Sequence, residues 1–313
     1  MRAPSLTSDS AGPVHIATCA DRNIAPGLHV TLSSARRSLD PSRPLVVHLF
    51  HRGYTDDDLV RLDATLALAG GDYEVRARPI SLQPFKGLDP IRGNSMTWAR
   101  LSLADWLPEL DRVVYLDSDL LVNRDLAGLA DLDLGGAAAG FVRSGATMRS
   151  GIEAGLFKTL GFNLDAPYYN AGVIVMDLAA WRAGVAEEGI RTARRYQGHL
   201  PAADQTVLNV LFYDRPVAPV HRSYNVLAFP MAPVRAHETP AVYHFIGAPK
   251  PWDLWGEWVN QHSGLYLEAL GHTALAGRRS YRHPSAAQIR SVARNVRKYL
   301  RGARIQLGLE EPA

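Results

Sequence analysis

Short apolar runs alternate with longer amphipathic segments along the 313-residue chain. The apolar runs have the length and composition of strands, and apolar residues at helical spacing are typical of surface helices. Helices are predicted over residues 28–39 and 56–70, the second opening at Thr55 with acidic residues in its first turn. Strands are predicted at residues 14–19, 44–50, 75–80, 112–116, 137–142, 171–178 and 241–245. This alternation predicts an α/β fold.

Composition places the chain among ordinary globular proteins. Hydrophobic residues make up 47% of it, enough for a sizeable core in one large domain or two small ones. The single cysteine, Cys19, can form no internal disulfide, which fits a reducing compartment. The opening residues MRAPSLTSDSAGP lack the apolar core of a signal peptide, and no stretch approaches the roughly 18 apolar residues that span a bilayer. These features predict a cytoplasmic protein.

The net charge of +3 hides a strong asymmetry. Residues 277–304 contain nine Lys or Arg and no Asp or Glu, so the rest of the chain carries about −6. A helix is predicted over residues 286–304, with an apolar stripe beside a basic one. The apolar stripe comprises Ile289, Val292, Val296, Tyr299 and Leu300, and the basic stripe comprises Arg290, Arg294, Arg297, Arg301 and Arg304. Such a helix either binds the anionic inner face of a plasma membrane as a peripheral anchor or docks on the rest of the protein. Binding of nucleic acid by this basic segment is a weaker interpretation, because no other feature of the sequence supports it.

The stretch RVVYLDSDLLV, residues 112–122, places two aspartates directly after a predicted buried strand. In open α/β sheets ligands bind outside the carboxyl ends of the strands, and residues i and i+2 of an extended segment share a side. Asp117 and Asp119 would repel each other unless a cation lay between them, and carboxylate oxygens suit Mg²⁺ or Mn²⁺. This D-x-D pattern therefore predicts a metal site in a cleft.

Two other interpretations of the same stretch stay open. In the first, Asp117 and Asp119 end the strand and cap the turn-like residues 123–125. In the second, the stretch is the nucleophile motif of a haloacid-dehalogenase-like phosphatase. That motif usually has Thr or Val where this chain has Leu121, and it belongs to an early strand, whereas Asp117 lies a third of the way along.

Further segments carry polar side chains next to predicted strands or helices. Those that follow the first strand can reach the base and ribose of a nucleotide. The candidates are Asp21, Asn23, Arg100, Asn170, Asp204 and Gln205. Finally, YHFIGAPKPW, residues 243–252, offers an imidazole at His244, a flexible glycine at Gly247 and a cation at Lys250. A metal-bound diphosphate needs a further ligand, a backbone that approaches phosphate closely and a positive charge.

In their order along the chain, D-x-D, YYNAG and HF-x-G-x-x-KPW resemble the motifs of the retaining glycosyltransferases of family 8. The family includes glycogenin and bacterial lipopolysaccharide or lipooligosaccharide glucosyl- and galactosyltransferases. The resemblance runs from about Val14 to Trp252. It implies an α/β, Rossmann-like GT-A domain over residues 13–270, preceded by a flexible segment 1–12 and followed by a basic segment 271–313. It also implies a UDP-sugar donor carrying glucose or galactose, Mn²⁺ (or Mg²⁺) as cofactor, and a glycan or glycolipid acceptor.

The resemblance further implies roles for individual residues. The metal ligands are Asp117, Asp119 and His244. The donor contacts are Ala17, Thr18, Cys19, Asp21, Asn23, Arg100, Asp117, Ser118, Asp119, Gly247 and Lys250. The catalytic set around the transferred sugar is Asn170, Asp204 and Gln205. Because an amide is a poor nucleophile, Gln205 predicts front-face transfer with the departing phosphate oxygen as base, in place of the carboxylate pair of retaining glycosidases.

The chain departs from the family pattern at two places. Ile24 stands where relatives often have an aromatic residue after Asn23. FVRSGAT, residues 141–147, stands where many bacterial relatives have an acid near the sugar, which leaves the identity of the sugar open. The self-glucosylated tyrosine of glycogenin has no counterpart. An alternative of a different class is a catalytically inactive relative that binds nucleotide sugar or glycan, although the intact D-x-D and HF-x-G-x-x-KPW motifs argue against it.

Several candidates also have plainer interpretations. Asp21 and Asn23 could be turn residues, and Asp204 could be a helix N-cap. His244 could be an ordinary hydrogen-bonded histidine beside a strand. Among the tryptophans, core positions are predicted for Trp98, Trp106 and Trp181, and a platform for an acceptor sugar for one of Trp252, Trp255 and Trp258.

Overall fold

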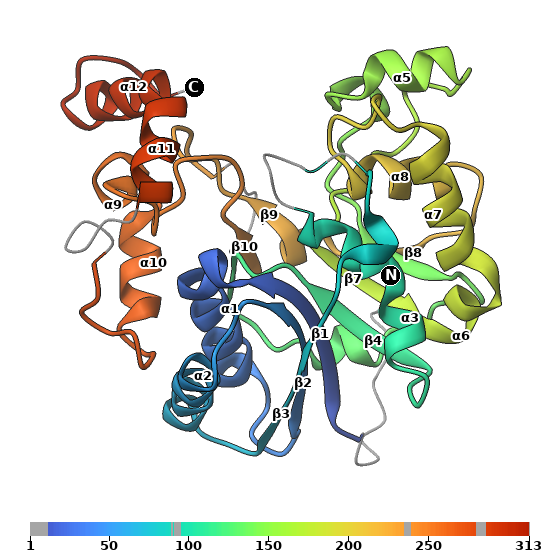
Figure 1. Ribbon diagram of the computed structural model, residues 1–313, viewed down its shortest axis with the longest axis horizontal. Coiled ribbons are helices and arrows are strands. Elements are labelled where there is room, and N and C mark those ends of the chain that lie inside the picture. Colours follow the sequence, from blue (N-terminus) through green and yellow to red (C-terminus); the bar gives the residue numbers. More distant parts are fainter. Residues whose placement is uncertain (1–11, 89, 91–94, 235–238, 280–285, 313) are drawn as a thin grey trace.

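A mixed sheet of seven strands forms the centre of the molecule (Figure 1). The computed structural model describes residues 12–88, 90, 95–234, 239–279 and 286–312, so the predicted flexible N-terminal segment lies almost entirely outside the described residues. The strand order is β3-β2-β1-β4-β7-β6-β8. The strands are β1 Val14–Asp21, β2 Leu45–Arg52, β3 Tyr73–Pro79, β4 Arg112–Leu116, β6 Ala139–Val142, β7 Val173–Asp177 and β8 Ala218–Val220.

The first four strands of this order run parallel, and β7 then reverses the direction of the sheet. β1 pairs in parallel with both β2 and β4, while β7 lies antiparallel between β4 and β6. A smaller sheet, in the order β5-β10-β9, consists of β5 Leu120–Val122, β9 Val226–Leu227 and β10 Val242–His244. All seven predicted strands are confirmed. The two- and three-residue strands β5, β8 and β9 were not predicted, because they are too short to show a periodic pattern.

Helices cover both faces of the large sheet (Figure 1). The helices predicted over residues 28–39 and 56–70 are confirmed as α1 Ala25–Ser38 and α2 Asp56–Ala69, and Thr55 and Asp58 form a capping box at the start of α2. The other helices are α3 Leu103–Trp106, α4 Ala127–Ala130, α5 Ala154–Thr159, α6 Leu178–Ala180, α7 Ala186–Arg195, α8 Asp204–Leu211, α9 Gly256–Val259, α10 Ser263–Leu270, α11 Ala286–Arg294 and α12 Val296–Gln306.

Alternation along β1 explains why the sheet has a core on each side. Ile16 faces α1 and α2 in one cluster of buried side chains, and Ala17 faces the cluster that contains Trp98 and Trp181. Trp98 and Trp181 are fully buried, and the partly buried Trp106 packs on Phe50, so the core positions predicted for these tryptophans are confirmed.

The C-terminal basic segment contains two helices, so the single helix predicted over residues 286–304 is wrong in that respect. The helix is interrupted at Asn295, whose side chain donates to the carbonyl of Ser291 at 2.9 Å. The second helix, α12, docks on α9: Tyr299 donates to the carbonyl of Leu254 at 2.7 Å, and a Cβ at Gly302 would lie 2.8 Å from the carbonyl oxygen of Val259. Within the described ranges, no helix has both the length and the apolar character required to cross a bilayer.

The buried imidazole of His29 ties α1 to α2. Its Nδ1 lies 2.6 Å from the hydroxyl of Thr65, and burial, with a smaller effect of Arg278, lowers the pKa of His29 to about 4. The folded protein thus binds fewer protons at this position than the unfolded chain between pH 4 and 6.5. The contribution of His29 to stability is therefore complete above about pH 6.5 and is lost as the pH falls.

We expect His29→Gln to flatten this acid dependence. The free energy of unfolding of the unsubstituted protein should fall between pH 6.5 and 4 by up to about 3 kcal/mol more than that of the variant. Urea denaturation at several pH values measures the difference. Parallel curves for the two proteins would show that His29 titrates normally.

Candidate active site

The antiparallel pair β4 and β7 brings the first aspartate to the YYNAG segment. Leu116, the last residue of β4, pairs with Val173, the first residue of β7. The pairing continues one residue further, because the amide of Asp117 donates to the carbonyl of Gly172 at 2.9 Å. Asp117 and the turn before β7, including Asn170, therefore lie side by side.

The small sheet brings His244 to the second aspartate. β5 begins directly after Asp119, and Leu120 of β5 pairs with His244 of β10 in antiparallel register. The amide of Phe245 donates to the carbonyl of Asp119 at 2.9 Å, which extends this pairing. A backbone ladder thus connects two motifs that are far apart in the sequence.

Asp117, Asp119 and His244 form a cluster suited to a divalent cation. One ligand atom from each lies within 4.8 Å of the others. His244 Nε2 lies 3.1 Å from Asp119 Oδ1 and 3.8 Å from Asp117 Oδ2. Asp119 Oδ1 is buried and has no hydrogen-bond partner among the described residues, although it is within ion-pair distance of the imidazole. A buried carboxylate oxygen without a donor fits a cation as its missing partner.

A second contact orients the imidazole. His244 Nδ1 lies 2.9 Å from Asn225 Oδ1, and the Asn225 amide donates to Asn170 Oδ1 at 2.8 Å. Since Asn225 presents an oxygen, Nδ1 carries the proton and Nε2 keeps its lone pair for a metal. Asn225 was not predicted, because a lone asparagine after a short strand gives no sequence signal.

Lys250 neutralises the second carboxylate. Its ammonium lies 2.6 Å from Asp119 Oδ2 and also donates to the carbonyl of Phe245. Burial alone would raise the pKa of Asp119, but Lys250 and His244 hold that pKa below its ordinary value. The carboxylate is therefore ionised at neutral pH and available as a ligand.

Arg100 forms a buried ion pair with the carboxylate of Asp117. It lies on the 3₁₀ helix Met96–Ser102, its side chain is only 4% exposed, and its Nη2 donates to Asp117 Oδ1 at 2.8 Å. Its Nε lies 2.8 Å from Asp204 Oδ2, but the N–H points to the carbonyl of Thr97, so this contact is Coulombic without an aligned hydrogen bond. These contacts fix the side chain of Arg100 next to Asp117, and its predicted role as a donor contact stays a prediction.

Asp204 is buried beside this arginine. Helix α8 begins at Asp204 with Ala203 as its N-cap residue, so the interpretation of Asp204 as the N-cap is wrong. Burial raises the pKa of Asp204 to about 6, although Arg100 opposes the shift. The two aspartates, Asp117 and Asp204, thus share one guanidinium.

Gln205 is fixed by hydrogen bonds at both ends of its amide. Its oxygen accepts from Asn170 Nδ2 at 2.9 Å and from the backbone amide of Ala171 at 3.1 Å. Its nitrogen donates to the hydroxyl of Tyr168 at 2.5 Å, and that hydroxyl donates to the buried carboxylate of Glu153 at 2.9 Å. Glu153 was missed because the sequence around it has no motif, and Tyr168 was missed although it is the first residue of YYNAG, because the motif drew attention to Asn170.

Comparisons with known proteins show the family of the chain. The model of a protein family described as Glycosyl transferase family 8 matches residues 15–256. The chain belongs to glycosyl transferase family 8.

The relatives of this family 8 protein include a lipopolysaccharide galactosyltransferase. The chain is 26% identical to lipopolysaccharide 1,3-galactosyltransferase of Salmonella typhimurium, covering 84% of this chain and 79% of that protein. It is 24% identical to general stress protein A of Bacillus subtilis, covering 77% and 87% respectively. The solved structure of galactosyltransferase LgtC with donor and acceptor sugar analogues has a TM-score of 0.70 at 26% identity, covering 83% of this chain and 96% of that one. The protein is a GT-A glycosyltransferase, so the phosphatase alternative has no support.

The nucleotide end of the predicted site follows β1 of this family 8 glycosyltransferase. The predicted contacts Ala17, Thr18 and Cys19 lie within β1 rather than at its end, since the strand continues to Asp21. The side chain of Asp21 accepts from the amide of Asn23 at 2.8 Å, which is the predicted turn. Burial raises the pKa of the Cys19 thiol well above its usual range, so it stays neutral.

A side-chain contact joins this strand to the D-x-D motif. The hydroxyls of Thr18 and Ser118 lie 2.9 Å apart in the interior. A Cβ at Gly27 would lie 2.6 Å from the carbonyl oxygen of Ser118, so α1 approaches the motif closely. The contacts of Thr18 and Gly27 with Ser118 hold β1, α1 and the D-x-D motif together. In the segment between His244 and Lys250, Gly247 has a φ of +78°, a conformation that favours glycine and lets the backbone turn there.

The tryptophans after Lys250 differ in exposure. Trp252 is 8% exposed and packs against Phe245 and Tyr266, so it is unsuited to stacking on a sugar. Trp255 and Trp258 are 42% and 56% exposed. Of the three predicted platforms, only these two are accessible.

Gly172 makes room for the imidazole of His244. A Cβ there would lie 2.5 Å from His244 Nδ1 and 3.0 Å from Asn170 Oδ1. We expect Gly172→Ala to displace His244 and to weaken metal binding by roughly 10- to 100-fold, a loss typical for disturbed ligand orientation. Titration with Mn²⁺ followed by calorimetry measures it.

Gly155→Ala is the matched control for this substitution. It adds the same methyl group on α5, where nothing lies within 4 Å of the added atom. Its metal affinity should stay unchanged. Equal affinities in both variants would show that the space at Gly172 is not needed by the metal site.

Proposed function

We propose that the protein is a metal-dependent, retaining hexosyltransferase that moves glucose or galactose from a UDP-sugar to a hydroxyl of a glycan or glycolipid. The observation that carries this proposal is the cluster of Asp117, Asp119 and His244 with its unpartnered buried oxygen. Mn²⁺ is the proposed ion, with Mg²⁺ as the second choice, because the set combines two carboxylates and one imidazole.

The charges around the cluster suit departure of a diphosphate. A bound divalent cation supplies Lewis-acid stabilisation of the leaving group. Lys250 is 2.6 Å from Asp119, so the cation would compete with its ammonium for this carboxylate, and a diphosphate would offer the ammonium a new partner. Gly247 permits close approach of the backbone to the same group. Asp21, Asn23 and the backbone of β1 are the proposed contacts of the uridine.

The environment of Gln205 supports front-face transfer. A double displacement needs a nucleophile, and the amide of Gln205 is held by Asn170, Ala171 and Tyr168. The nearby carboxylate of Asp204 is engaged by Arg100. With the leaving phosphate oxygen as base, the acceptor hydroxyl attacks from the face that the diphosphate leaves, and configuration is retained. Asn170, Asp204 and Gln205 then orient the sugar and the residues around it.

Donor and metal can be identified together. Purified protein would be incubated with UDP-glucose or UDP-galactose in the presence of Mn²⁺, Mg²⁺ or EDTA, and UDP release would be measured with and without a glycan acceptor. We expect slow hydrolysis without acceptor, no turnover in EDTA and recovery on adding Mn²⁺. Binding that stabilises the protein in thermal-shift assays, with no UDP release under any condition, would instead support the inactive, sugar-binding alternative.

We also propose that the C-terminal helices bring the enzyme to the anionic inner face of the plasma membrane. Although α12 docks on α9, the apolar side chains of Ile289, Val296 and Leu300 remain 54%, 47% and 61% exposed beside the basic stripe. An apolar stripe flanked by arginines is the pattern of peripheral membrane helices.

Exposed residues allow this association to be tested without truncating the chain. Ile289→Ser with Leu300→Ser should reduce co-sedimentation with vesicles that contain phosphatidylglycerol. Val60→Ser, at a 68% exposed position on α2, is the control. Equal co-sedimentation of all three proteins would contradict a membrane role.

A further inference from the structure

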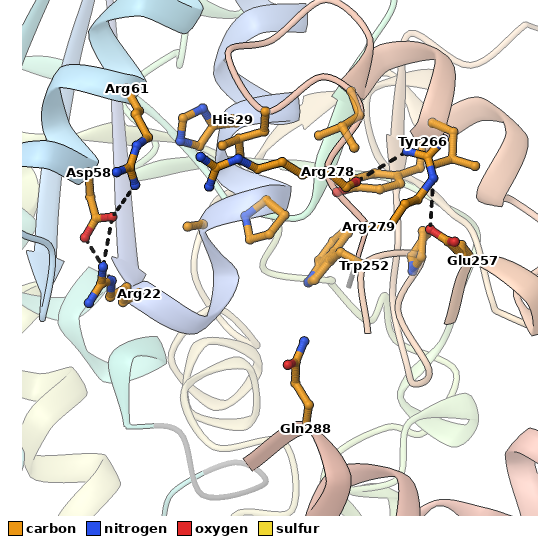
Figure 2. Close-up of a pocket in the computed structure, with 16 residues that line it drawn as sticks. Arg22, His29, Asp58, Arg61, Trp252, Glu257, Tyr266, Arg278, Arg279 and Gln288 are labelled. Atoms are coloured by element: carbon orange, nitrogen blue, oxygen red, sulfur yellow. Dashed lines mark hydrogen bonds and ion pairs between the residues drawn. The ribbon is translucent and has the colours of Figure 1, made fainter. Parts of the chain in front are cut away.

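A cavity of about 320 Å³ lies between the helices α1 and α2 on one side and the C-terminal helices on the other (Figure 2). This volume is near the lower end of the range for small-molecule pockets, roughly 300–1,000 Å³. None of the residues proposed for the donor or the metal lines it. Its charged lining consists of Arg22, Asp58, Arg61, Glu257, Arg278 and Arg279.

Positive charge exceeds negative charge on these walls. On the α1–α2 wall, Arg22 and Arg61 share a single carboxylate, with distances to Asp58 of 2.9 and 3.5 Å. On the opposite wall, Arg279 lies 3.7 Å from Glu257. Four guanidinium groups thus face two carboxylates.

Arg278 accounts for much of the excess positive charge in the cavity. Among the described residues, no carboxylate lies within ion-pair distance of it, and Figure 2 shows its side chain extending beside His29, between the two walls. His29 is 2% exposed, and the pKa of about 4 described above leaves it neutral at physiological pH. Neighbouring arginines repel one another, so an anion between them would be stabilised by several of these groups at once.

The chemistry of the lining indicates what kind of anion fits. Guanidinium groups bind phosphate through paired hydrogen bonds better than ammonium groups do. Next to them, Leu267, Leu270, Leu275 and Trp252 supply an apolar wall. We propose that this cavity is an anion site, separate from the donor site, that binds the phosphate group of a small molecule or of a lipid headgroup, with an attached apolar moiety against the leucines.

The site is connected to the candidate active site at two points. Arg22 precedes Asn23, and Trp252 follows Lys250 by two residues. An occupied cavity would therefore hold both segments that the donor is proposed to contact.

Inorganic pyrophosphate is the probe for the first source of phosphate. The full-length protein would be titrated calorimetrically without divalent cations. We expect Arg278→Gln to weaken binding about tenfold or more, the loss of one charge-assisted hydrogen bond. Arg290→Gln removes the same charge at an exposed position on α11 outside the cavity and should leave the affinity unchanged. Lys250→Gln should also leave it unchanged, since that residue belongs to the donor site.

Vesicles test the second source. Phosphatidylcholine vesicles with and without phosphatidylglycerol would be co-sedimented with the same variants. A loss larger in Arg278→Gln than in Arg290→Gln, without pyrophosphate binding, assigns the cavity to a lipid headgroup. Indistinguishable Arg278→Gln and Arg290→Gln variants in both assays, or pyrophosphate binding that depends only on Lys250, would overturn the proposal.

Discussion

Asp119→Asn should abolish metal-dependent sugar transfer while leaving the protein folded. The substitution keeps the shape of the side chain but removes the charge that lies between His244 and Lys250. In the proposed mechanism, stabilisation of the leaving group depends on this carboxylate as a metal ligand. We therefore expect turnover to fall by about 10²- to 10³-fold or more, and Mn²⁺ affinity to fall with it. Initial rates of UDP release and calorimetric Mn²⁺ titration measure the two effects.

The control for this prediction is Asp105→Asn. Asp105 is exposed on α3, away from the candidate active site, and the substitution changes charge and shape in the same way. It should have full activity, and both variants should unfold near the temperature of the unsubstituted protein. Undiminished turnover in Asp119→Asn would remove the metal site from the mechanism.

Arg100→Met should have the largest effect on stability. The methionine fills similar space but leaves the carboxylates of Asp117 and Asp204 without their shared cation. Breaking a buried ion pair by removing one partner costs about 3–5 kcal/mol, because the remaining charge stays buried. Arg100→Lys should lower the free energy of unfolding by less, because the ammonium keeps the positive charge. It should not restore the full stability, because an ammonium cannot bridge both carboxylates.

Urea denaturation measures these losses, and Arg149→Met provides the comparison. Arg149 forms an ion pair with Asp165 at 3.0 Å in which both side chains are largely exposed. Removing it should cost no more than about 1 kcal/mol. A loss at Arg100 as small as at Arg149 would show that the two buried carboxylates do not need this cation. Adding Asp204→Asn to Arg100→Met should recover part of the stability.

The sequence predicted the strands well, because apolar runs leave a local signal. It also singled out Asp117, Asp119 and His244, which the structure brings together. Asp117 and Asp119 directly follow a buried apolar run, and the motif around His244 is distinctive. The contacts among these residues left no such signal. Arg100 was predicted as a donor contact, and its position next to Asp117 depends on how the 3₁₀ helix Met96–Ser102 packs against β1.

Long-range polar partners were hardest to predict. Asn225 orients His244, and Glu153 contacts Gln205 through the hydroxyl of Tyr168. Neither Asn225 nor Glu153 lies in a recognisable sequence pattern, so neither contact could be predicted. The C-terminal helix shows a different limit. Its periodicity predicted one continuous amphipathic helix. The local hydrogen bond of Asn295 to Ser291 and the tertiary contact of Tyr299 with Leu254 cannot be read from periodicity.

The pairing of β5 with β10 has a consequence for the order in which a growing chain acquires its parts. β5 pairs only with β10 in the described part of the chain, and β10 carries His244. A chain leaving the ribosome therefore has both aspartates long before it has the histidine and Lys250. Until then, neither His244 nor the neutralising ammonium of Lys250 is present. The cluster of the two aspartates with His244 is therefore completed late in synthesis, and a chain stopped before Val242 lacks it even when the large sheet has formed.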